Sequence, residues 1–277
     1  MMTKLVNLTY KYSILGVFIR LVSYISLQMI NIWYEITASL RKNKIGRSKY
    51  RELLDLEDKY KGKRCFVICT GPSLTIEDLE KLKDEYTFGM NSLCLWKEKS
   101  SFRPKFFGCC DLGVYRKLKY QIIDYCSNRT EIFVSDRLAR QDTVDKNWHI
   151  VPLNVAYHAY SRWFKENFWC KFRPNAYVGV YDMHSVTHFL IQIAVYMGFT
   201  EIYLLGADTN QVLGKKVHFQ DYGVPDTTIG TARERNICGY EEIKKHMNEY
   251  GFKVYNATRG GMLEVFERVD LDEIITN

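Results

Sequence analysis

The stretch that most constrains the fold is Arg64–Leu74, RCFVICTGPSL, in which a short apolar run leads directly into a Gly-Pro-Ser turn. The next residues, TIEDL, begin a helical pattern. A strand, a tight turn and a helix start leave backbone N–H groups unpaired, and these groups bind anions, most often phosphate. The segment predicts a phosphate cradle at Gly71, Pro72 and Ser73. The alternative is an ordinary connection between a strand and a helix.

Strand and helix patterns alternate along the rest of the chain, which predicts an α/β fold. The unit 185–205, a buried helix that starts at Ser185 and feeds a strand, is typical of the right-handed crossover in a parallel sheet. We expect a Rossmann-like domain over residues 61–277, with a mostly parallel sheet flanked by helices. The irregular, aromatic-rich residues 154–180 are interpreted as a lid or small subdomain. Strands are expected at 64–70, 87–95, 104–110, 131–135, 149–153, 201–205 and 253–256, and further helices at 75–84, 115–126 and 234–250.

The first 60 residues form a separate segment. Residues 5–37 are apolar and aromatic, but Arg20 leaves only about fourteen apolar residues after it, fewer than the roughly twenty of a spanning helix. A basic run from Arg41 to Arg51 follows. We expect an amphipathic helix on the inner face of the cell membrane, with the protein cytoplasmic. The alternatives are a helix packed on the protein's own body or in a seam between identical subunits, so a homo-oligomer stays open.

Charge and cysteine content exclude several classes. The formal net charge of +7 is modest, and no zinc-finger spacing or RNA-binding aromatic motif accompanies it, so nucleic acid is not expected as a partner. The eight cysteines form no CxxC pair. They are interpreted as reduced thiols rather than disulfides or metal ligands.

Polar residues follow several of the expected strands. Asn91, Asp111 and Asp208 lie near the carboxyl ends of strands, where open α/β sheets bind their ligands. Two of them, Asp111 and Asp208, could hold Mg²⁺, although helix capping or turn formation explains them equally. No cofactor is firmly expected. Arg259, beside two glycines, could meet a phosphate.

Three segments resemble one family, the MptE-like domain named for an archaeal 6-hydroxymethylpterin diphosphokinase. They are CTGPSL with Asn91 downstream, SVTHFLIQIAVYMGFTEIYLLGAD, and HFQDY followed by VYNATRGGMLEVFERVDLD. The first two also resemble bacterial sialyltransferases, in which the turn holds a CMP-sugar and a loop histidine is the general base. That resemblance assigns the base to His218 and a supporting catalytic place to Asp208. Thr209 and Asn210 stand where the sialyltransferases carry tyrosines.

These resemblances imply two reactions. The first is transfer of a sugar from a nucleotide-activated donor, CMP-linked among the candidates, to a glycan or lipid-linked acceptor in cell-surface polysaccharide synthesis. His218 would take the acceptor proton, and Lys215, Lys216 and Tyr222 would steady the departing phosphate. The second is Mg-ATP-dependent diphosphoryl transfer. A non-catalytic nucleotide-binding protein is the third alternative. The predicted nucleotide contacts are Gly71, Pro72, Ser73, Asn91, Asp111, Ser185, Lys215, Lys216, Tyr222 and Arg259.

Overall fold

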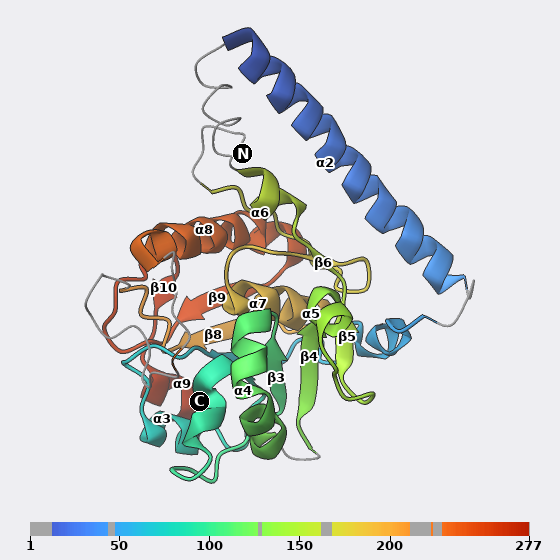
Figure 1. Ribbon diagram of the computed structural model, residues 1–277. Coiled ribbons are helices and arrows are strands. Elements are labelled where there is room, and N and C mark those ends of the chain that lie inside the picture. The colour runs from blue at the N-terminus through green and yellow to red at the C-terminus, as the bar shows by residue number, and fades with distance from the viewer. Residues whose placement is uncertain are drawn as a thin grey trace.

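An eight-stranded parallel sheet forms the centre of the molecule (Figure 1), and its order is β10-β9-β8-β1-β2-β3-β4-β5. The computed structural model describes residues 13–43, 48–126, 129–161, 168–210, 223 and 229–276. The α/β, Rossmann-like fold expected from the sequence is confirmed. The strands are β1 Arg64–Ile68, β2 Thr87–Met90, β3 Phe106–Cys109, β4 Glu131–Ser135, β5 His149–Val151, β8 Glu201–Leu205, β9 Lys253–Asn256 and β10 Glu267–Arg268, with a separate pair, β6 Leu153–Asn154 and β7 Val180–Tyr181.

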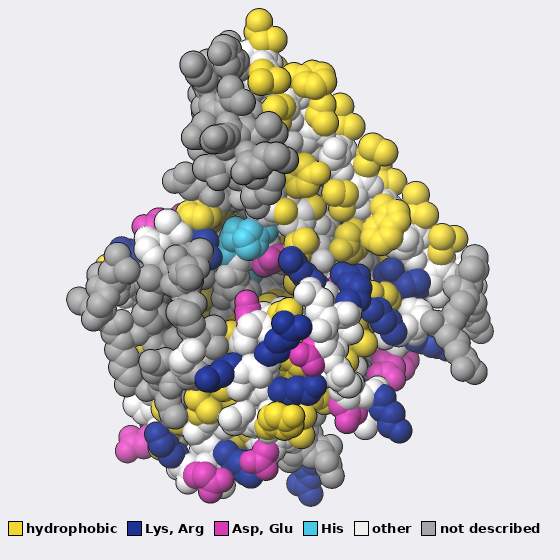
Figure 2. Space-filling model, viewed as in Figure 1, with side chains coloured by type: hydrophobic (Ala, Val, Ile, Leu, Met, Phe, Trp, Pro, Cys, Tyr) yellow, Lys and Arg dark blue, Asp and Glu magenta, His cyan; other side chains and the backbone are white. Residues whose placement is uncertain are grey.

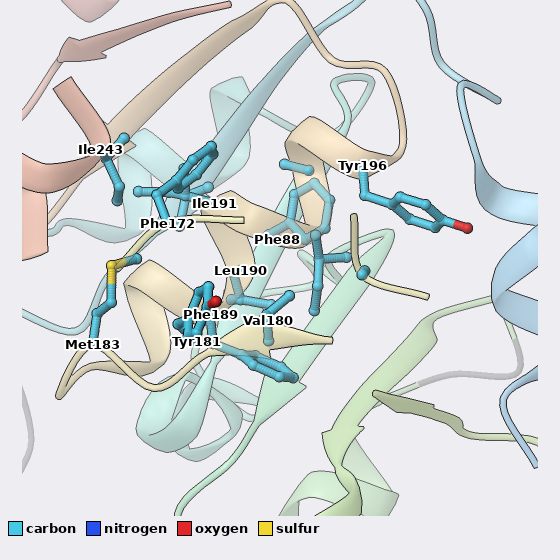
Figure 3. Packing of buried hydrophobic residues seen from close by; sticks show 14 of the residues in the cluster. Phe88, Phe172, Val180, Tyr181, Met183, Phe189, Leu190, Ile191, Tyr196 and Ile243 are labelled. Carbon is cyan, nitrogen blue, oxygen red and sulfur yellow. The ribbon is translucent and has the colours of Figure 1, made fainter. Parts of the chain in front are cut away.

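Alternate residues of each strand face opposite helical layers, as the pleat requires. In β1, Cys65 and Val67 join the core under α7 (Val186–Tyr196), and Phe66 and Ile68 join the core on the other face. Figure 3 shows the first core, where Phe189, Leu190 and Ile191 of α7 pack with Phe88 and Val180. The other described helices are α2 Ser13–Lys42, α3 Ile76–Lys81, α4 Leu112–Tyr125, α5 Asp136–Gln141, α6 Ala156–Tyr160, α8 Ala232–Tyr250 and α9 Leu271–Thr276, with 3₁₀ turns at Arg51–Leu56, Asn91–Trp96 and Ile229–Thr231.

Four strands differ from their predicted bounds: the expected strand 64–70 ends at Ile68, the expected strand 104–110 covers only Phe106–Cys109, and two others differ for a clear physical reason. The expected strand 87–95 ends at Met90, because Asn91 takes a left-handed conformation (φ 45°) and starts a 3₁₀ turn. The expected strand 149–153 divides at Pro152, which has no N–H to donate to a sheet. β5 pairs with β4 before the proline, and β6 pairs with β7 after it.

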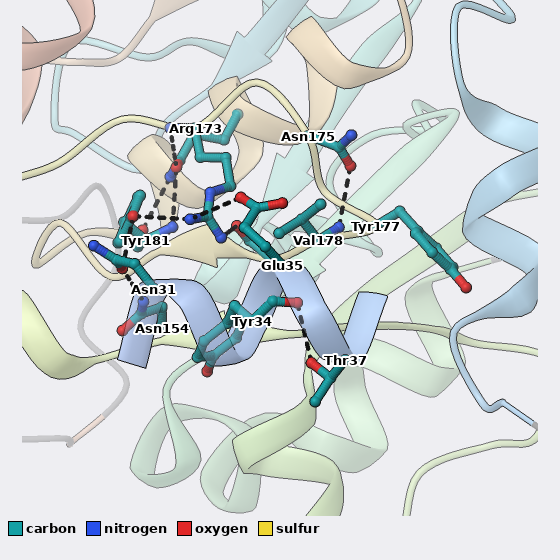
Figure 4. A network of polar contacts seen from close by, with 12 residues as sticks. Asn31, Tyr34, Glu35, Thr37, Asn154, Arg173, Asn175, Tyr177, Val178 and Tyr181 are labelled. Atoms are coloured by element: carbon teal, nitrogen blue, oxygen red, sulfur yellow. Dashed lines mark hydrogen bonds and ion pairs between the residues drawn. The ribbon is translucent and has the colours of Figure 1, made fainter. Parts of the chain in front are cut away.

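The N-terminal helix α2 is buried along one side and exposed along the other. Its second half is docked on the body by a polar network in which Asn31 Oδ1 accepts from the Tyr181 hydroxyl at 2.9 Å and Glu35 pairs with Arg173 at 3.3 Å (Figure 4). Tyr34 adds a hydrogen bond from its hydroxyl to the Leu153 carbonyl at 3.0 Å. The outer side presents apolar side chains to solvent along the helix, from Ile14 at 86% exposure to Trp33 at 59% (Figure 2).

The helix is also longer than the sequence estimate. Residues Ile14–Lys42 are long and apolar enough to cross a membrane by length and composition, because Arg20 lies within one continuous helix rather than ending it. The expectation of a segment too short to span is therefore wrong. Membrane association itself stays a prediction.

The aromatic segment 154–180 is built into the core over its described residues. Tyr157 is buried and makes edge contacts with Trp169 and Tyr181, at ring distances of 4.8 and 5.3 Å. Phe172 and Tyr177 are buried as well. Hydrogen bonds attach the segment to both helices: Asn31 of α2 donates to the Tyr157 hydroxyl at 3.0 Å, and Arg173 N–H donates to Gln192 of α7 at 3.2 Å. Its proposed closure over a site stays a prediction.

Candidate functional site

The order in which the chain adds strands to the sheet reverses between β1 and β8, and a pocket lies at that point. Along the chain, β2 to β5 are added on one side of β1, whereas β8 to β10 are added on the other. Open α/β sheets bind ligands at the carboxyl ends of strands beside such a switch. The pocket there has a volume of about 120 Å³. Its described lining comes from the ends of β1, β2 and β8, the start of α7 and one side of α8: Cys69, Thr70, Gly71, Met90, Asn91, Ser185, Val186, Thr187, Gly206, Ala207, Asp208, Thr209, Asn236 and Tyr240.

Asp208 connects the two motifs that follow β1 and β8. Its carboxylate is only 5% exposed and accepts a hydrogen bond from Ser73 Oγ at 2.7 Å. A β-carbon on Gly71 would lie 2.0 Å from Asp208 Oδ2, so only glycine leaves room for the carboxylate. The Gly-Pro-Ser turn and the Gly-Ala-Asp segment are therefore in direct contact.

The amides of the Gly-Pro-Ser turn are already paired within the protein. Gly71 N–H donates to the Gly206 carbonyl at 2.9 Å, and Leu74 N–H donates to the Gly71 carbonyl at 3.2 Å. Thr75 N–H donates to the carboxylate of Asp78 at 3.1 Å, in a capping box. The expectation that these N–H groups stay unpaired for a phosphate is wrong, because nearby carbonyl and carboxylate oxygens accept from them.

The first turn of α7 supplies the positive helix end that the pocket needs. Ser185 caps the helix, with its hydroxyl accepting from Thr187 N–H at 3.2 Å, and residues 185–187 all line the pocket. The macrodipole of this eleven-residue helix favours an anion at its N-terminus. Thr187 Oγ1 lies 3.4 Å from Cys69 Sγ. Burial raises the pKa of Cys69 to about 12, so it is a neutral thiol rather than a nucleophile.

Backbone strain and open hydrogen-bonding capacity coincide at the pocket. Asn91 (φ 45°) and Thr209 (φ 47°) both take left-handed conformations, which is unfavourable for a β-branched residue such as Thr209. Asn91 Oδ1 and Thr209 Oγ1 are buried, and among the described residues neither has a hydrogen-bond partner. Strained residues with unsatisfied buried oxygens are typical of ligand sites.

Other predicted site residues lie elsewhere. Asp111 is exposed and caps α4, accepting from Val114 N–H at 2.7 Å, which is the structural alternative that the sequence allowed. Arg259 is paired with Asp78 at 2.9 Å. The glycine turn beside it approaches protein rather than ligand, since a β-carbon on Gly261 would lie 2.9 Å from the Asp208 backbone. Lys215, Lys216, His218 and Tyr222 lie outside the described residues.

No group of three His, Cys, Asp or Glu side chains that could hold a metal ion occurs within the described ranges. Asp111 and Asp208, the two residues predicted to hold Mg²⁺, therefore have no third metal ligand beside them among the described residues. Asp208 contacts Ser73, whereas Asp111 caps its own helix. Mg²⁺ stays an untested option.

Sequence reasoning missed the contribution of α8. Asn236 and Tyr240 line the pocket because α8 packs closely on α7: a β-carbon on Gly239 would lie 2.3 Å from the His188 ring. His188 itself is fully buried, with Nδ1 2.6 Å from the Met183 carbonyl, and is a packing residue. A lone glycine in an amphipathic helix indicates that another element packs closely against it, but the sequence does not identify that element.

Comparisons with solved structures support the fold. The MAf glycosyltransferase of Magnetospirillum magneticum AMB-1 matches with a TM-score of 0.50 at 16% identity, over 78% of this chain and 35% of that one. The chain thus spans about a third of the length of that enzyme. The sialyltransferase CstII of Campylobacter jejuni, in complex with cytidine-5'-monophosphate, matches with a TM-score of 0.49 at 15% identity, over 76% of this chain and 85% of that one. No curated protein matches the sequence.

A family profile gives the more direct relationship. The profile described as 6-hydroxymethylpterin diphosphokinase MptE-like matches residues 39–212. That range includes all of the described pocket lining except Asn236 and Tyr240 of α8. The chain therefore belongs to the MptE-like family.

Proposed function

We propose that the chain is a glycosyltransferase that uses a nucleotide-activated sugar, CMP-linked among the candidates, in the synthesis of a cell-surface polysaccharide. The observation that carries the proposal is the pocket at the switch between β1 and β8, with a helix N-terminus at one side and strained, unsatisfied polar residues at the other. Both features suit a ligand that carries phosphate and hydroxyl groups together. The solved structure that matches with a TM-score of 0.50 is a glycosyltransferase, which supports the proposal.

The lining divides into two chemical parts. The start of α7 offers a helix dipole and the Ser185 hydroxyl, which favour a phosphate. Asp208 and Asn91 offer a carboxylate and an amide, which suit the hydroxyl groups of a sugar. The volume of about 120 Å³ is below the roughly 300–1,000 Å³ of typical ligand pockets. One part of the donor would therefore enter, and the remainder would extend toward the pocket mouth.

A membrane-bound acceptor fits the exposed side of α2. We propose that this side contacts the inner face of the cell membrane, where a lipid-linked glycan would be presented. The exposed apolar side chains, Ile14, Phe18 and Ile25 among them, support that placement. The sugar, the acceptor and the cellular location are all parts of this proposal.

The decisive experiment is a thermal-shift panel with CMP, UDP, GDP, ATP and their sugar conjugates, with and without EDTA. A ligand that binds the native state raises its stability by mass action, about 2.7 kcal/mol at a hundred times its Kd. We expect stabilisation by a pyrimidine nucleotide and its sugar conjugate that survives the chelator. Stabilisation by none of the compounds would refute a nucleotide-sugar donor.

Membrane binding is tested by substitution rather than by deletion. Removing all of α2 would take away the Asn31 and Tyr34 hydrogen bonds and expose the core, so loss of folding would confuse the result. Ile25→Glu, on the exposed side at 50% exposure, should shift the protein from pelleted anionic vesicles to the supernatant. Ile123→Glu on α4, with 49% exposure, is the matched control and should leave vesicle binding unchanged.

Diphosphoryl transfer from ATP is the second candidate, favoured by the family description. It would need Mg²⁺ to neutralise the phosphates. ATP stabilisation that disappears in EDTA, together with AMP release, would favour this reaction over sugar transfer. If nucleotide binds but no donor is ever turned over, the third alternative, a non-catalytic nucleotide-binding protein, is left.

A further inference from the structure

A histidine–carboxylate pair lies beside the pocket but outside its lining. His158 on α6 places Nδ1 2.8 Å from Asp182 Oδ2, just after β7. The other carboxylate oxygen, Oδ1, accepts the backbone N–H of His184 at 3.1 Å. Asp182 is thereby fixed at both oxygens. A carboxylate that holds Nδ1 of an imidazole orients the ring and leaves Nε2 as the atom that exchanges a proton.

His184 adds strain to this pair. Its backbone is left-handed (φ 68°), and its ring lies 4.0 Å from the His158 ring between centroids. Both ring nitrogens of His184 are buried and have no partner among the described side chains and backbone groups. Burial lowers the pKa of His184 to about 3, so its ring is neutral. A strained conformation costs about 1–3 kcal/mol and persists where the surroundings enforce it, most often at active sites.

The pair is accessible and adjacent to the pocket. His184 directly precedes Ser185, the pocket residue that caps α7. Asp182 also lies close to Cys110, the residue that follows β3. Burial raises the pKa of the Cys110 thiol, and the nearby negative charge of Asp182 raises that pKa further. The His158 side chain is 43% exposed. Figure 2 shows histidine at the surface at the level of α6.

We infer that His158, oriented by Asp182, is the base that takes the proton from the acceptor hydroxyl. The inference rests on the proposed sugar transfer. In the step, the acceptor oxygen bonds to the anomeric carbon as its proton moves to His158 Nε2. The bond from that carbon to the phosphate oxygen breaks, and its electron pair leaves with the nucleotide. Asp182 stabilises the imidazolium until the proton passes to water. His158 thus takes the role that sequence reasoning gave to His218.

The experiment compares His158→Gln with His218→Ala in the full-length protein. The readout is release of free nucleotide from CMP-, UDP- and GDP-sugars, with extracted lipid-linked glycans as acceptor. We expect His158→Gln to lower the rate roughly 100- to 10,000-fold, the usual contribution of a positioned base. The shift in Tm caused by nucleotide should stay at the wild-type value, because His158 does not line the pocket. If His218→Ala loses the rate while His158→Gln keeps it, the base is His218 and the inference is overturned.

Asp182 is tested as a positioning residue. Asp182→Asn should lower the rate in the same direction, and Asp182→Glu should restore part of it, which a purely structural role would not do. His246→Gln is the matched control, since His246 also pairs with a carboxylate, Glu249 at 2.7 Å, but lies far along α8.

Two results would decide against the inference, and they are distinguishable. A wild-type rate in His158→Gln, together with nucleotide release by the wild-type protein, overturns the assignment of the base alone. No release by the wild-type protein from any donor overturns the proposed function, and the assignment fails with it.

Discussion

The two edges of the sheet use the same strands for different purposes. At the amino-terminal edge, polar side chains are paired: Arg64 with Glu85 at 2.7 Å, and His149 Nε2 with Glu131 at 3.1 Å. At the carboxyl-terminal edge, Asn91 and Thr209 are strained, and each has a buried oxygen that lacks a partner within the described structure. Nδ1 of His149 at the amino-terminal edge also lacks a hydrogen-bond partner among the described residues, but at the carboxyl-terminal edge the unpartnered atoms belong to residues with left-handed backbones. The paired residues and the strained residues thus lie at opposite ends of the same strands.

The largest difference between the two edges is expected from substitution of the two glycines that flank β1. In Gly71→Ala the new methyl group would lie 2.0 Å from the Asp208 carboxylate and 2.4 Å from the Gly206 carbonyl. We expect a loss of about 3 kcal/mol in the free energy of unfolding and loss of nucleotide stabilisation. Gly62→Ala, at the other edge, meets nothing within 4 Å and should cost only about 1 kcal/mol for its φ of +76°. Equal costs in urea unfolding would break the comparison.

The edges should also respond to acid in different pH windows. Burial lowers the pKa of His188, under the carboxyl-terminal edge, to about 4. Between pH 6.5 and 4 the unfolded chain binds a proton there that the native protein does not, so stability falls as pH falls, by on the order of 3 kcal/mol. At the other edge, the hydrogen bond from His149 lowers the pKa of Glu131. The ionised Glu131 therefore stabilises the native state at neutral pH, and this stabilisation is lost only as the pH falls below the ordinary glutamate range.

Urea unfolding at pH 7, 6, 5 and 4 measures the first of these windows. His188→Gln should reduce the slope between pH 6.5 and 4 by about half, because His184, whose pKa burial lowers to about 3, contributes in the same window. The variant itself also loses stability through the Met183 hydrogen bond. An unchanged slope in the variant would mean that another group carries the pH dependence.

Relief of strain gives a smaller, opposite effect. Thr209→Gly should stabilise the protein by about 1 kcal/mol, because glycine tolerates φ 47°, and should weaken nucleotide binding. Asp58→Gly relieves a similar φ of 55° at the amino-terminal side and should stabilise the protein without any change in binding. Calorimetry and nucleotide titration of both variants would sharpen the comparison. Reduced binding in Asp58→Gly would contradict it.

The smallest effect is expected from the paired edge. Glu85→Gln removes the charge that Arg64 meets, and partly exposed ion pairs contribute about 1 kcal/mol or less. Nucleotide binding should be unchanged. A loss of binding in this variant would show that the two edges are coupled.

Much of the fold followed from local pattern. The strand bounds at 131–135, 201–205 and 253–256 and the Ser185 cap are correct, because apolar runs and capping residues act within a few positions. Asn91, Ser185 and Asp208 reached the pocket because strand ends and helix starts meet at one edge.

The remainder depends on contacts between distant segments. The paired state of Arg259 requires knowledge that Asp78 lies opposite it. The approach of α8 to α7, which brings Tyr240 to the pocket, depends on Gly239 meeting His188. The pairing of His158 with Asp182 likewise depends on how α6 lies against β7. None of these contacts can be predicted from a pattern of neighbouring residues in the sequence.

The strand order has a consequence for synthesis. β1 pairs with β8 along its whole length, Arg64 with Glu201 through Ile68 with Leu205, so the pocket between them cannot form until β8 has left the ribosome. Helix α2, with its exposed apolar side, is made before β1 and needs no strand to become helical. We expect the nascent chain to meet a membrane surface while its binding site is still incomplete, so that targeting precedes activity.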